Sequence, residues 1–364
     1  MKRDHLNLSA KVGLAAAVLL FFVWVSPQKF FPKDSGEQSA NAAAIAANAT
    51  SSRAVPAAPK VVTTSVEVLV VGDIMLDRNV GNLINEKGFD SVFAGVRDIV
   101  SSADIAIGNL EGPFTSYPSR TMSLQSKELV FTFNPALAPK LAGLGFDIVG
   151  LANNHTLNFG KEGLKQTREY VAGAGMQYYG DPNNGVGTAT SSRFISTVVE
   201  KNGIRIGLVG FHEFSYVGLD NVLAEIDRLR PQVDVLIVSP HWGVEYQKEP
   251  TSSMWKNARL FIDHGADAVI GAHPHVVGNT DEYQGKKIFY SLGNFAFDQY
   301  FSKATMNGLA IHISILKQTS SIEPAPHVSL MYSLIPIQSD RAGVRVATST
   351  KAIENARGLE AARR

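Results

Sequence analysis

Six short, largely apolar runs, each followed by glycine or polar residues, constrain the fold of this 364-residue chain more than any other feature. They are Val66–Val71, Asp104–Ile107, Phe146–Leu151, Ile204–Val209, Val233–Ser239 and Ala268–Ile270. Runs of this length bounded by loop residues are typical of buried strands. Between them, Ser91–Ser101 and a segment from about Lys161 to Ala172 carry apolar residues near helical spacing. The alternation predicts an α/β fold built from strand–helix–strand units.

The pattern changes beyond Lys286, where short strands follow one another with turns between them. The expected strands are Lys287–Ser291, Leu309–Leu316, His327–Pro336 and Val344–Ala347. Because no helical segment separates them, they predict an antiparallel second sheet or an antiparallel edge.

Polar side chains stand directly after the first group of strands, and one of these strands, Ile204–Val209, ends near His212. The candidates are Asp73, Glu111, Asn154, His155, His241, His273 and His275. Ligands of open α/β sheets bind outside the carboxyl ends of the strands, so these scattered residues are expected to form one site. Oxygen and imidazole donors suit Mn, Zn or Fe, and there are enough of them for two metals.

Each candidate also has a purely structural interpretation. A lone His-x-His pair such as His273 and His275 often lies in a solvated loop, and Asn153-Asn154-His155 fits a turn. Asp73 fits a helix N-cap, and Glu111 fits a surface carboxylate. Only their coincidence at strand ends favours a shared site.

Composition and motifs exclude several classes of protein. The chain has 34 Lys plus Arg against 33 Asp plus Glu, which disfavours a nucleic-acid binder. It has no cysteine, so disulfides, cysteine–zinc sites and thiol catalysis are excluded. Nucleotide-binding glycine motifs and the G-x-S-x-G motif of serine hydrolases are absent from the sequence.

The N-terminus carries an export signal. A basic stretch, Met1–Lys11, precedes fourteen uncharged residues, Val12–Val25. As a helix they span roughly 21 Å, short of a bilayer core of about 30 Å, which favours a cleaved signal peptide. No A-x-A-like cleavage site follows directly, and the segment ending at Lys33 is typical of an interfacial anchor. We therefore expect 1–33 to be an uncleaved signal anchor of a single-pass membrane protein, with the C-terminal domain outside the cytoplasm; secretion after cleavage is the alternative.

The remaining boundaries follow from composition. Residues 34–60 are rich in Ala, Ser and Asn and predict a flexible linker. A single folded domain is expected over 61–350, followed by a C-terminal tail over 351–364.

Six ordered blocks in this domain resemble the CapA family of poly-γ-glutamate capsule biosynthesis proteins. They are Gly72–Leu76, Gly108–Glu111, Ala152–His155, His241–Tyr246, Gly271–Val276 and Tyr290–Phe295. That family in turn resembles a branch of the calcineurin-like metallophosphatases. The resemblance implies an α/β (α+β) fold of two packed β-sheets flanked by helices, in four αββα layers.

The resemblance also assigns roles to individual residues. It implies metal ligands at Asp73, Glu111, Asn154, His241, His273 and His275. Glu111 is the best match to the bridging carboxylate, with Asn109 or Asp104 as weaker candidates. His155 is expected to contact the reacting group, where His155 and also Glu245 would hydrogen-bond the substrate oxygen or protonate the leaving group. The chain departs from the superfamily pattern at Met75, where a His is usual, and at Asn158, where an Asp is usual.

Three functions are compatible with this pattern. The first is a membrane-anchored factor of poly-γ-glutamate or capsule biosynthesis with a metal-dependent hydrolase site that holds two divalent ions. Its partners would be an anionic polymer and a capsule-synthesis membrane complex. The second is a metallophosphoesterase acting on small or cell-wall phosphoesters, and the third is a non-catalytic polymer-binding scaffold.

Overall fold

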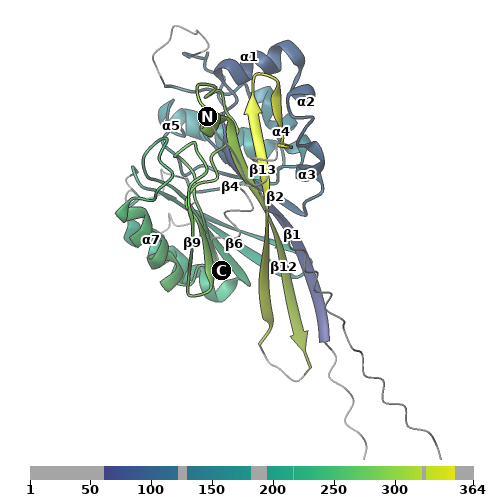
Figure 1. The fold of residues 1–364 in the computed structure, drawn as a ribbon, viewed down its shortest axis with the longest axis vertical. Coiled ribbons are helices and arrows are strands. Elements are labelled where there is room, and N and C mark those ends of the chain that lie inside the picture. The colour runs from purple at the N-terminus through teal and green to yellow at the C-terminus, as the bar shows by residue number, and fades with distance from the viewer. Residues whose placement is uncertain (1–60, 122–128, 182–194, 216, 322–324, 349–364) are drawn as a thin grey trace, which may run out of the picture. The chain divides into compact units, whose positions relative to one another are not determined.

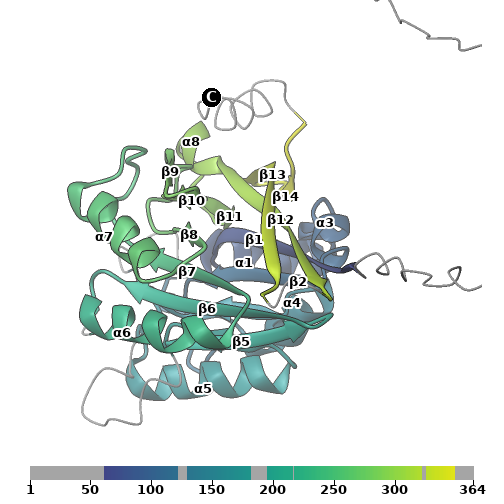
Figure 2. The ribbon, with the colours of Figure 1, turned by 90° about the horizontal axis from the view of Figure 1, so that it is seen from below.

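Two β-sheets packed face to face form the centre of the structure, a computed structural model (Figures 1 and 2). It describes residues 61–121, 129–181, 195–215, 217–321 and 325–348. The expected signal anchor (1–33), linker (34–60) and C-terminal tail (351–364) lie outside the described residues. Among the helices of the described part, none has the length and apolar character needed to cross a bilayer.

The first sheet has eight strands, in the order β14-β13-β12-β1-β2-β3-β4, and β11 also pairs with β1. Its strands are β1 (Val61–Ile74), β2 (Ile105–Leu110), β3 (Ile148–Gly150), β4 (Gln177–Tyr179), β11 (Asn294–Ala296), β12 (Asn307–Ser320), β13 (His327–Asp340) and β14 (Gly343–Val346). β1 to β4 are mutually parallel, whereas β12 to β14 form an antiparallel edge.

The second sheet has six strands, in the order β5-β6-β7-β8-β10-β9. They are β5 (Ser196–Lys201), β6 (Ile204–His212), β7 (Val235–His241), β8 (Ala268–Ile270), β9 (Thr280–Tyr283) and β10 (Lys286–Phe289). Strands β6, β7, β8 and β10 are parallel. The outer strands β5 and β9 are antiparallel to their neighbours.

Helices cover the outer face of each sheet. They are α1 (Arg78–Lys87), α2 (Phe89–Val92), α3 (Arg97–Ser101), α4 (Ala138–Leu144), α5 (Gly160–Gly173), α6 (Leu219–Leu229), α7 (Ser252–Asp263) and α8 (Lys303–Met306). Short 3-10 turns occupy Pro135–Leu137 and Arg230–Gln232. Figure 2 shows α6 and α7 on the second sheet, with α5 on the side of the first.

Three hydrophobic cores hold these layers together. Between the sheets, β1 and β2 side chains such as Val68 pack with β6 and β7 side chains such as Ile237. On the outer face of the first sheet, Leu69 and its neighbours pack with α1, α4 and α5. On the outer face of the second, Val238 and its neighbours pack with α6 and α7. The predicted α/β fold of two packed sheets flanked by helices, in four layers, is confirmed.

One local prediction was wrong, and another was confirmed only in part. The helix expected over Ser91–Ser101 is split into α2 and α3, because β14 approaches the chain between them. A Cβ at Gly95 would lie 2.5 Å from the Cβ of Arg345, and the Gly95 carbonyl accepts a hydrogen bond from the Val346 N–H. The antiparallel edge expected from the C-terminal strands is formed by β12 to β14, but the strand expected at Lys287–Ser291 does not join it. β12 to β14 extend the first sheet, while β10 is parallel to β8 in the second.

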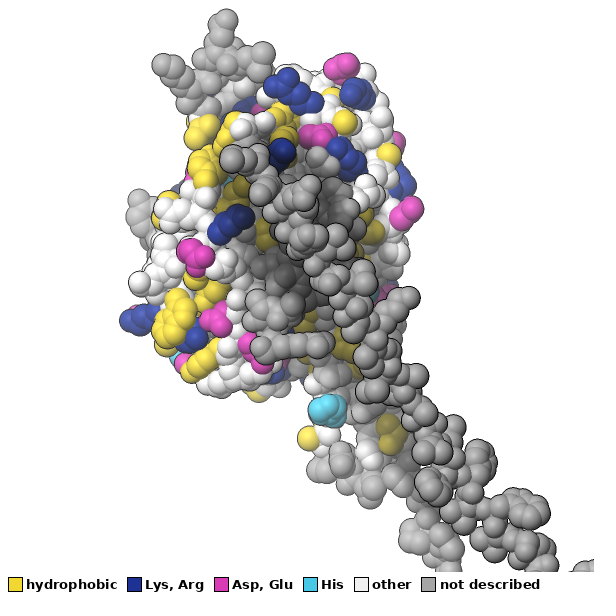
Figure 3. Space-filling view, viewed as in Figure 1, with side chains coloured by type: hydrophobic (Ala, Val, Ile, Leu, Met, Phe, Trp, Pro, Cys, Tyr) yellow, Lys and Arg dark blue, Asp and Glu magenta, His cyan; other side chains and the backbone are white. Residues whose placement is uncertain are grey.

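The surface has mixed charge. On the face drawn in Figure 3, Lys and Arg side chains are interspersed with Asp and Glu over the described residues. This distribution is consistent with the net charge of +1.

Candidate metal centre

The carboxyl ends of parallel strands from both sheets meet at one place and carry the predicted site residues there. Asp73, near the end of β1, pairs in register with Asn109 near the end of β2. His241, the last residue of β7, is in register with His212, the last residue of β6. His273 and His275 follow β8, and Asn154 and His155 follow β3.

Two glycines allow the chain to close tightly around this place. The Asp73 N–H donates a hydrogen bond of 3.0 Å to the Gly293 carbonyl, and a Cβ at Gly72 would lie 1.9 Å from that oxygen. A Cβ at Gly271 would lie 2.3 Å from the Tyr290 carbonyl oxygen. Only glycine fits at such distances, so the segment from Tyr290 lies directly against β1 and β8.

Asp73 and Glu111 form a fully buried carboxylate pair. Asp73 Oδ1 accepts a hydrogen bond of 2.8 Å from Asn109 Nδ2. Within the described residues, the other Asp73 oxygen and both Glu111 oxygens accept no hydrogen bond. Burial, and then the neighbouring Asp73 charge, raises the pKa of Glu111 well above its usual range. Buried carboxylates without donors are costly unless a cation accompanies them, so this pair fits a divalent ion.

The imidazoles of the site converge on the same region. His241 Nε2 lies 2.9 Å from Asn154 Oδ1 and 3.1 Å from His273 Nδ1. Burial lowers the pKa of both His241 and His273, with the surrounding histidines contributing. Their rings are therefore neutral at pH 7, the form in which histidine binds metals.

The donor atoms fall into two groups. Ligand atoms of Asp73, Glu111 and His241 lie within 4.8 Å of one another, and so do those of Glu245, His273 and His275. Two such clusters can hold two ions, and the mixture of oxygen and nitrogen donors suits Mn, Zn or Fe.

His275 is oriented by a partner outside these clusters. The amide nitrogen of Asn294 donates to Gln299 Oε1 and to the Thr305 carbonyl, so its Oδ1 accepts from His275 Nδ1 at 2.9 Å. The other ring nitrogen, Nε2, then faces Glu111 Oε1 at 3.5 Å with its lone pair free. Outer partners of this kind fix the ring orientation of metal-binding histidines.

His155 is held in one tautomer by Asn158. The Asn158 Oδ1 accepts a hydrogen bond of 2.7 Å from the Phe131 N–H and lies 3.1 Å from His155 Nδ1. Because that oxygen is an acceptor, Nδ1 carries the proton, and Nε2 points toward Glu111 Oε1 at 3.9 Å. Burial lowers the pKa of His155 to about 4, so the ring is neutral at pH 7.

All of the predicted site residues are brought together, whereas two other residues named by the sequence pattern lie elsewhere. Asp104 accepts from the Glu67 N–H just before the start of β2, at the strand end opposite the site. The prediction that Asp104 is a candidate for the bridging carboxylate was therefore wrong. Met75 is fully buried, and its sulfur accepts a hydrogen bond of 3.1 Å from the Asp77 N–H. Asn109 lies in the site and binds Asp73 and His241 rather than standing in for Glu111.

Sequence reasoning missed two residues beside the cluster. His212 is buried next to His241, with ring centroids 5.7 Å apart, and among the described residues neither ring nitrogen has a hydrogen-bond partner. The position of His212 at the end of β6 is the sequence signal that could have identified it. Arg78 pairs with Asp298, lies over the Phe131 ring and lowers the pKa of Glu111 electrostatically. No sequence pattern indicated Arg78.

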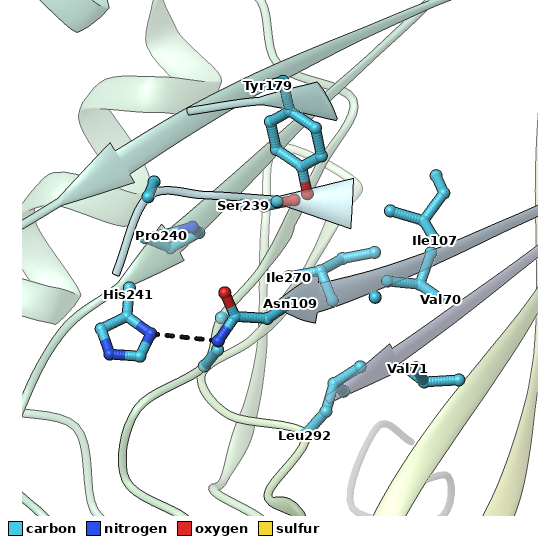
Figure 4. A pocket seen from close by; sticks show the side chains of 15 residues that line it. Val70, Val71, Ile107, Asn109, Tyr179, Ser239, Pro240, His241, Ile270 and Leu292 are labelled. Atoms are coloured by element: carbon cyan, nitrogen blue, oxygen red, sulfur yellow. Dashed lines mark hydrogen bonds between the residues drawn. The ribbon is translucent and has the colours of Figure 1, made fainter. Parts of the chain in front are cut away.

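A small cavity lies behind His241, between the two sheets (Figure 4). Its volume is about 30 Å³, and apolar strand residues line most of it. In Figure 4, Asn109 Nδ2 faces His241 Nδ1, at 3.4 Å, and Tyr179 points toward Ser239. The cavity has room for roughly one water molecule, so it supports His241 from behind and is too small for a substrate.

Exposed aromatic rings flank the imidazoles on both sides. Phe214 lies edge-on to His273, with centroids 5.1 Å apart. Tyr246 lies 6.4 Å from His275 and packs edge-on against Phe301. These three aromatic side chains are all exposed, so an apolar rim borders the candidate metal ligands.

The fold and the cluster together define a protein of the calcineurin-like metallophosphatase fold. The solved structure of a putative 5'-nucleotidase from Staphylococcus aureus, in complex with alpha-ketoglutarate, has this architecture with a TM-score of 0.50 and 13% sequence identity. The match covers 82% of this chain and 58% of that one. The likeness extends to the fold alone.

Sequence comparison identifies the family. The chain belongs to the bacterial capsule synthesis protein PGA_cap family, whose model matches residues 67–299. It is 31% identical over 285 residues to the PGA biosynthesis protein CapA of Bacillus subtilis, covering 74% of this chain and 73% of that protein. It is 29% identical over 260 residues to the capsule biosynthesis protein CapA of Bacillus anthracis, covering 66% of this chain and 62% of that protein. The resemblance to the CapA family is confirmed.

Proposed function

We propose that this chain is an exported, membrane-anchored factor in the biosynthesis of an anionic capsule polymer of the poly-γ-glutamate type, and that its metal centre is a hydrolase site. Family membership supports the process, because the two Bacillus relatives are named for PGA and capsule biosynthesis. The observation that carries the hydrolase is the buried pair Asp73 and Glu111, without hydrogen-bond donors of its own and faced by neutral imidazoles. Without a cation, this buried pair of carboxylates would destabilise the fold, because its charge would then lack a compensating ion.

The metal ligands in this proposal are Asp73, Glu111, Asn154, His241, His273 and His275, and they would hold two divalent ions. Zn, Mn and Fe fit the mixed oxygen and nitrogen donors. When bound, such ions would activate a water molecule and polarise the substrate. His155, neutral and with Nε2 free, would accept a proton or a hydrogen bond at that nitrogen, while Asn158 holds its ring. A neutral His155 would thus accept a proton, whereas the family resemblance implied that it could donate one to the leaving group.

The surroundings of the site support an extended anionic substrate. The Arg78 guanidinium is 22% exposed, pairs with Asp298 and acts electrostatically on Glu111. The exposed rings of Phe214, Tyr246 and Phe301 offer apolar contact on both sides of the imidazoles. A γ-linked polyglutamate chain presents carboxylates, methylene groups and planar amides, which match a cation and aromatic rings.

Membrane attachment through residues 1–33 is part of the proposal, with the folded domain outside the cytoplasm. The uncharged segment Val12–Val25, after a basic start, supports it. Attachment would keep the domain near the membrane components that produce the polymer. Fractionation of cells that express the full chain, with protease added from outside, tests this arrangement.

Hydrolysis assays test the site. The full chain, stripped of metal and reloaded with Mn or Zn, is incubated separately with poly-γ-glutamate and with bis(p-nitrophenyl) phosphate. Metal-dependent shortening of the polymer, lost in His155→Ala, supports the proposal. Turnover of the phosphodiester alone would instead establish the phosphoesterase function. Metal binding without turnover of either substrate would support a non-catalytic scaffold.

A further inference from the structure

The turn after β1 carries a thioether side chain two residues beyond Asp73. The residue there is Met75, whose side chain is fully buried. Its sulfur is directed into its own turn, where it accepts the Asp77 N–H. A thioether in that position is a poor partner for Mn or Zn. A site with two ions therefore needs donors other than this side chain.

Glu245 is placed by a loop that is fastened to the His273–His275 segment. The Trp242 N–H donates to the Ala272 carbonyl at 3.3 Å, and the Tyr246 N–H donates to the Pro274 carbonyl at 2.8 Å. Gly243 and Tyr246 adopt positive φ angles of 86° and 66°, which turn the loop back toward the site. A left-handed tyrosine is uncommon and needs surrounding contacts to hold it.

The Glu245 carboxylate consequently lies over two imidazoles. One of its oxygens is within 4.8 Å of ring nitrogens of both His273 and His275. Within the part of the chain that the structure describes, no lysine or arginine forms an ion pair with Glu245. A half-buried carboxylate with an oxygen this close to two imidazoles is arranged as a ligand.

We infer that Glu245 is a metal ligand, which with His273 and His275 forms one of the two metal positions of the site. The inference rests on the proposed metal-dependent function, and it replaces the proton-transfer role expected for Glu245. Two imidazoles and one glutamate are the donor set of zinc peptidase sites, so this position favours Zn over Mn. The position formed by Asp73, Glu111 and His241 has more oxygen donors and tolerates Mn.

Zinc titration by calorimetry, together with elemental analysis of the metal-loaded full chain, tests the inference. Glu245→Gln keeps the shape of the side chain and removes its charge, and Glu245→Ala removes the donor entirely. Glu249→Gln is the matched control, because Glu249 is an exposed carboxylate four residues further along that binds Asn279. Circular dichroism of each variant establishes that the fold is retained.

The wild-type protein and Glu249→Gln should bind about two zinc ions. Glu245→Ala should retain about one, and in Glu245→Gln one of the two affinities should fall at least about tenfold. Two ions bound with unchanged affinities in both Glu245 variants would overturn the inference and leave the proposed function intact. Absence of zinc binding by the wild-type chain would refute the proposed function as well.

Discussion

The buried carboxylate of Glu111 gives the sharpest prediction, because its effect on stability should change sign with metal. In the metal-free protein both of its oxygens are buried without a hydrogen-bond donor among the described residues, beside the Asp73 charge. Glu111→Gln removes the carboxylate charge and introduces an amide N–H that can donate a hydrogen bond to Asp73. A buried unsatisfied polar group costs about 1–3 kcal/mol, so the variant should be more stable than the wild type by about that amount.

Thermal unfolding with chelator measures this gain. For domains of about 150–250 residues, 1 kcal/mol shifts Tm by roughly 2–4 °C, so we expect a rise of about 2–12 °C. Because the pKa of Glu111 is raised, ionising it disfavours the fold, and the gain should grow as pH rises through that pKa. Glu86→Gln, on the exposed face of α1, is the control and should not move Tm.

Added Mn or Zn should reverse the order of stability. Wild-type protein at 100 times its Kd gains about 2.7 kcal/mol from binding, whereas Glu111→Gln should gain much less. A variant that is less stable than the wild type in chelator, or that gains as much from metal, would refute the reasoning.

Three further predictions concern the support of the site. Gly72→Ala should destabilise the protein by about 1–3 kcal/mol or more in urea unfolding, because its Cβ would meet a carbonyl oxygen 1.9 Å away. Gly143→Ala is the control: a Cβ there would meet nothing within 4 Å, so stability should change by no more than about 1 kcal/mol. Asn158→Asp should raise the pKa of His155 from about 4 by roughly 1–3 units, measured by NMR titration, and an unchanged pKa would contradict the contact described here. The pKa of His155 and of His212 is lowered to about 4 in the folded protein. As pH falls below about 6.5, these two histidines are therefore protonated first in the unfolded chain. The free energy of unfolding of the metal-free protein should fall by on the order of 2 kcal/mol per histidine by pH 5. The measurement is made in Glu111→Gln, which lacks the buried carboxylate. A free energy of unfolding that does not change between pH 7 and pH 5 would contradict this prediction.

Much of the fold could be predicted because buried parallel strands leave a local signal in the sequence. Val66–Val71 and Ala268–Ile270 were recognisable from composition alone, and both lie in the observed strands β1 and β8. The extension of β1 to Val61 could not be predicted, since it depends on pairing with β12 more than 200 residues away. The break between α2 and α3 likewise depends on a distant partner, Arg345, which approaches Gly95.

The site was predictable to the extent that its residues follow strands. Asp73, His241 and His273 come directly after apolar runs, so their convergence followed from the rule for strand ends. Arg78 reaches the site through an ion pair with Asp298, 220 residues away, and no local pattern indicates such a contact. Glu245 was noticed through family resemblance, but its approach to His273 and His275 depends on loop hydrogen bonds that only the structure reveals.

Metal content is the most direct test of the central claim. The full chain is purified in detergent without chelator, and Zn, Mn and Fe are quantified by elemental analysis beside a variant with both His273→Ala and His275→Ala. The account predicts about two divalent ions per wild-type chain and a clear loss in the double variant. A wild-type chain with no more metal than the double variant would contradict it.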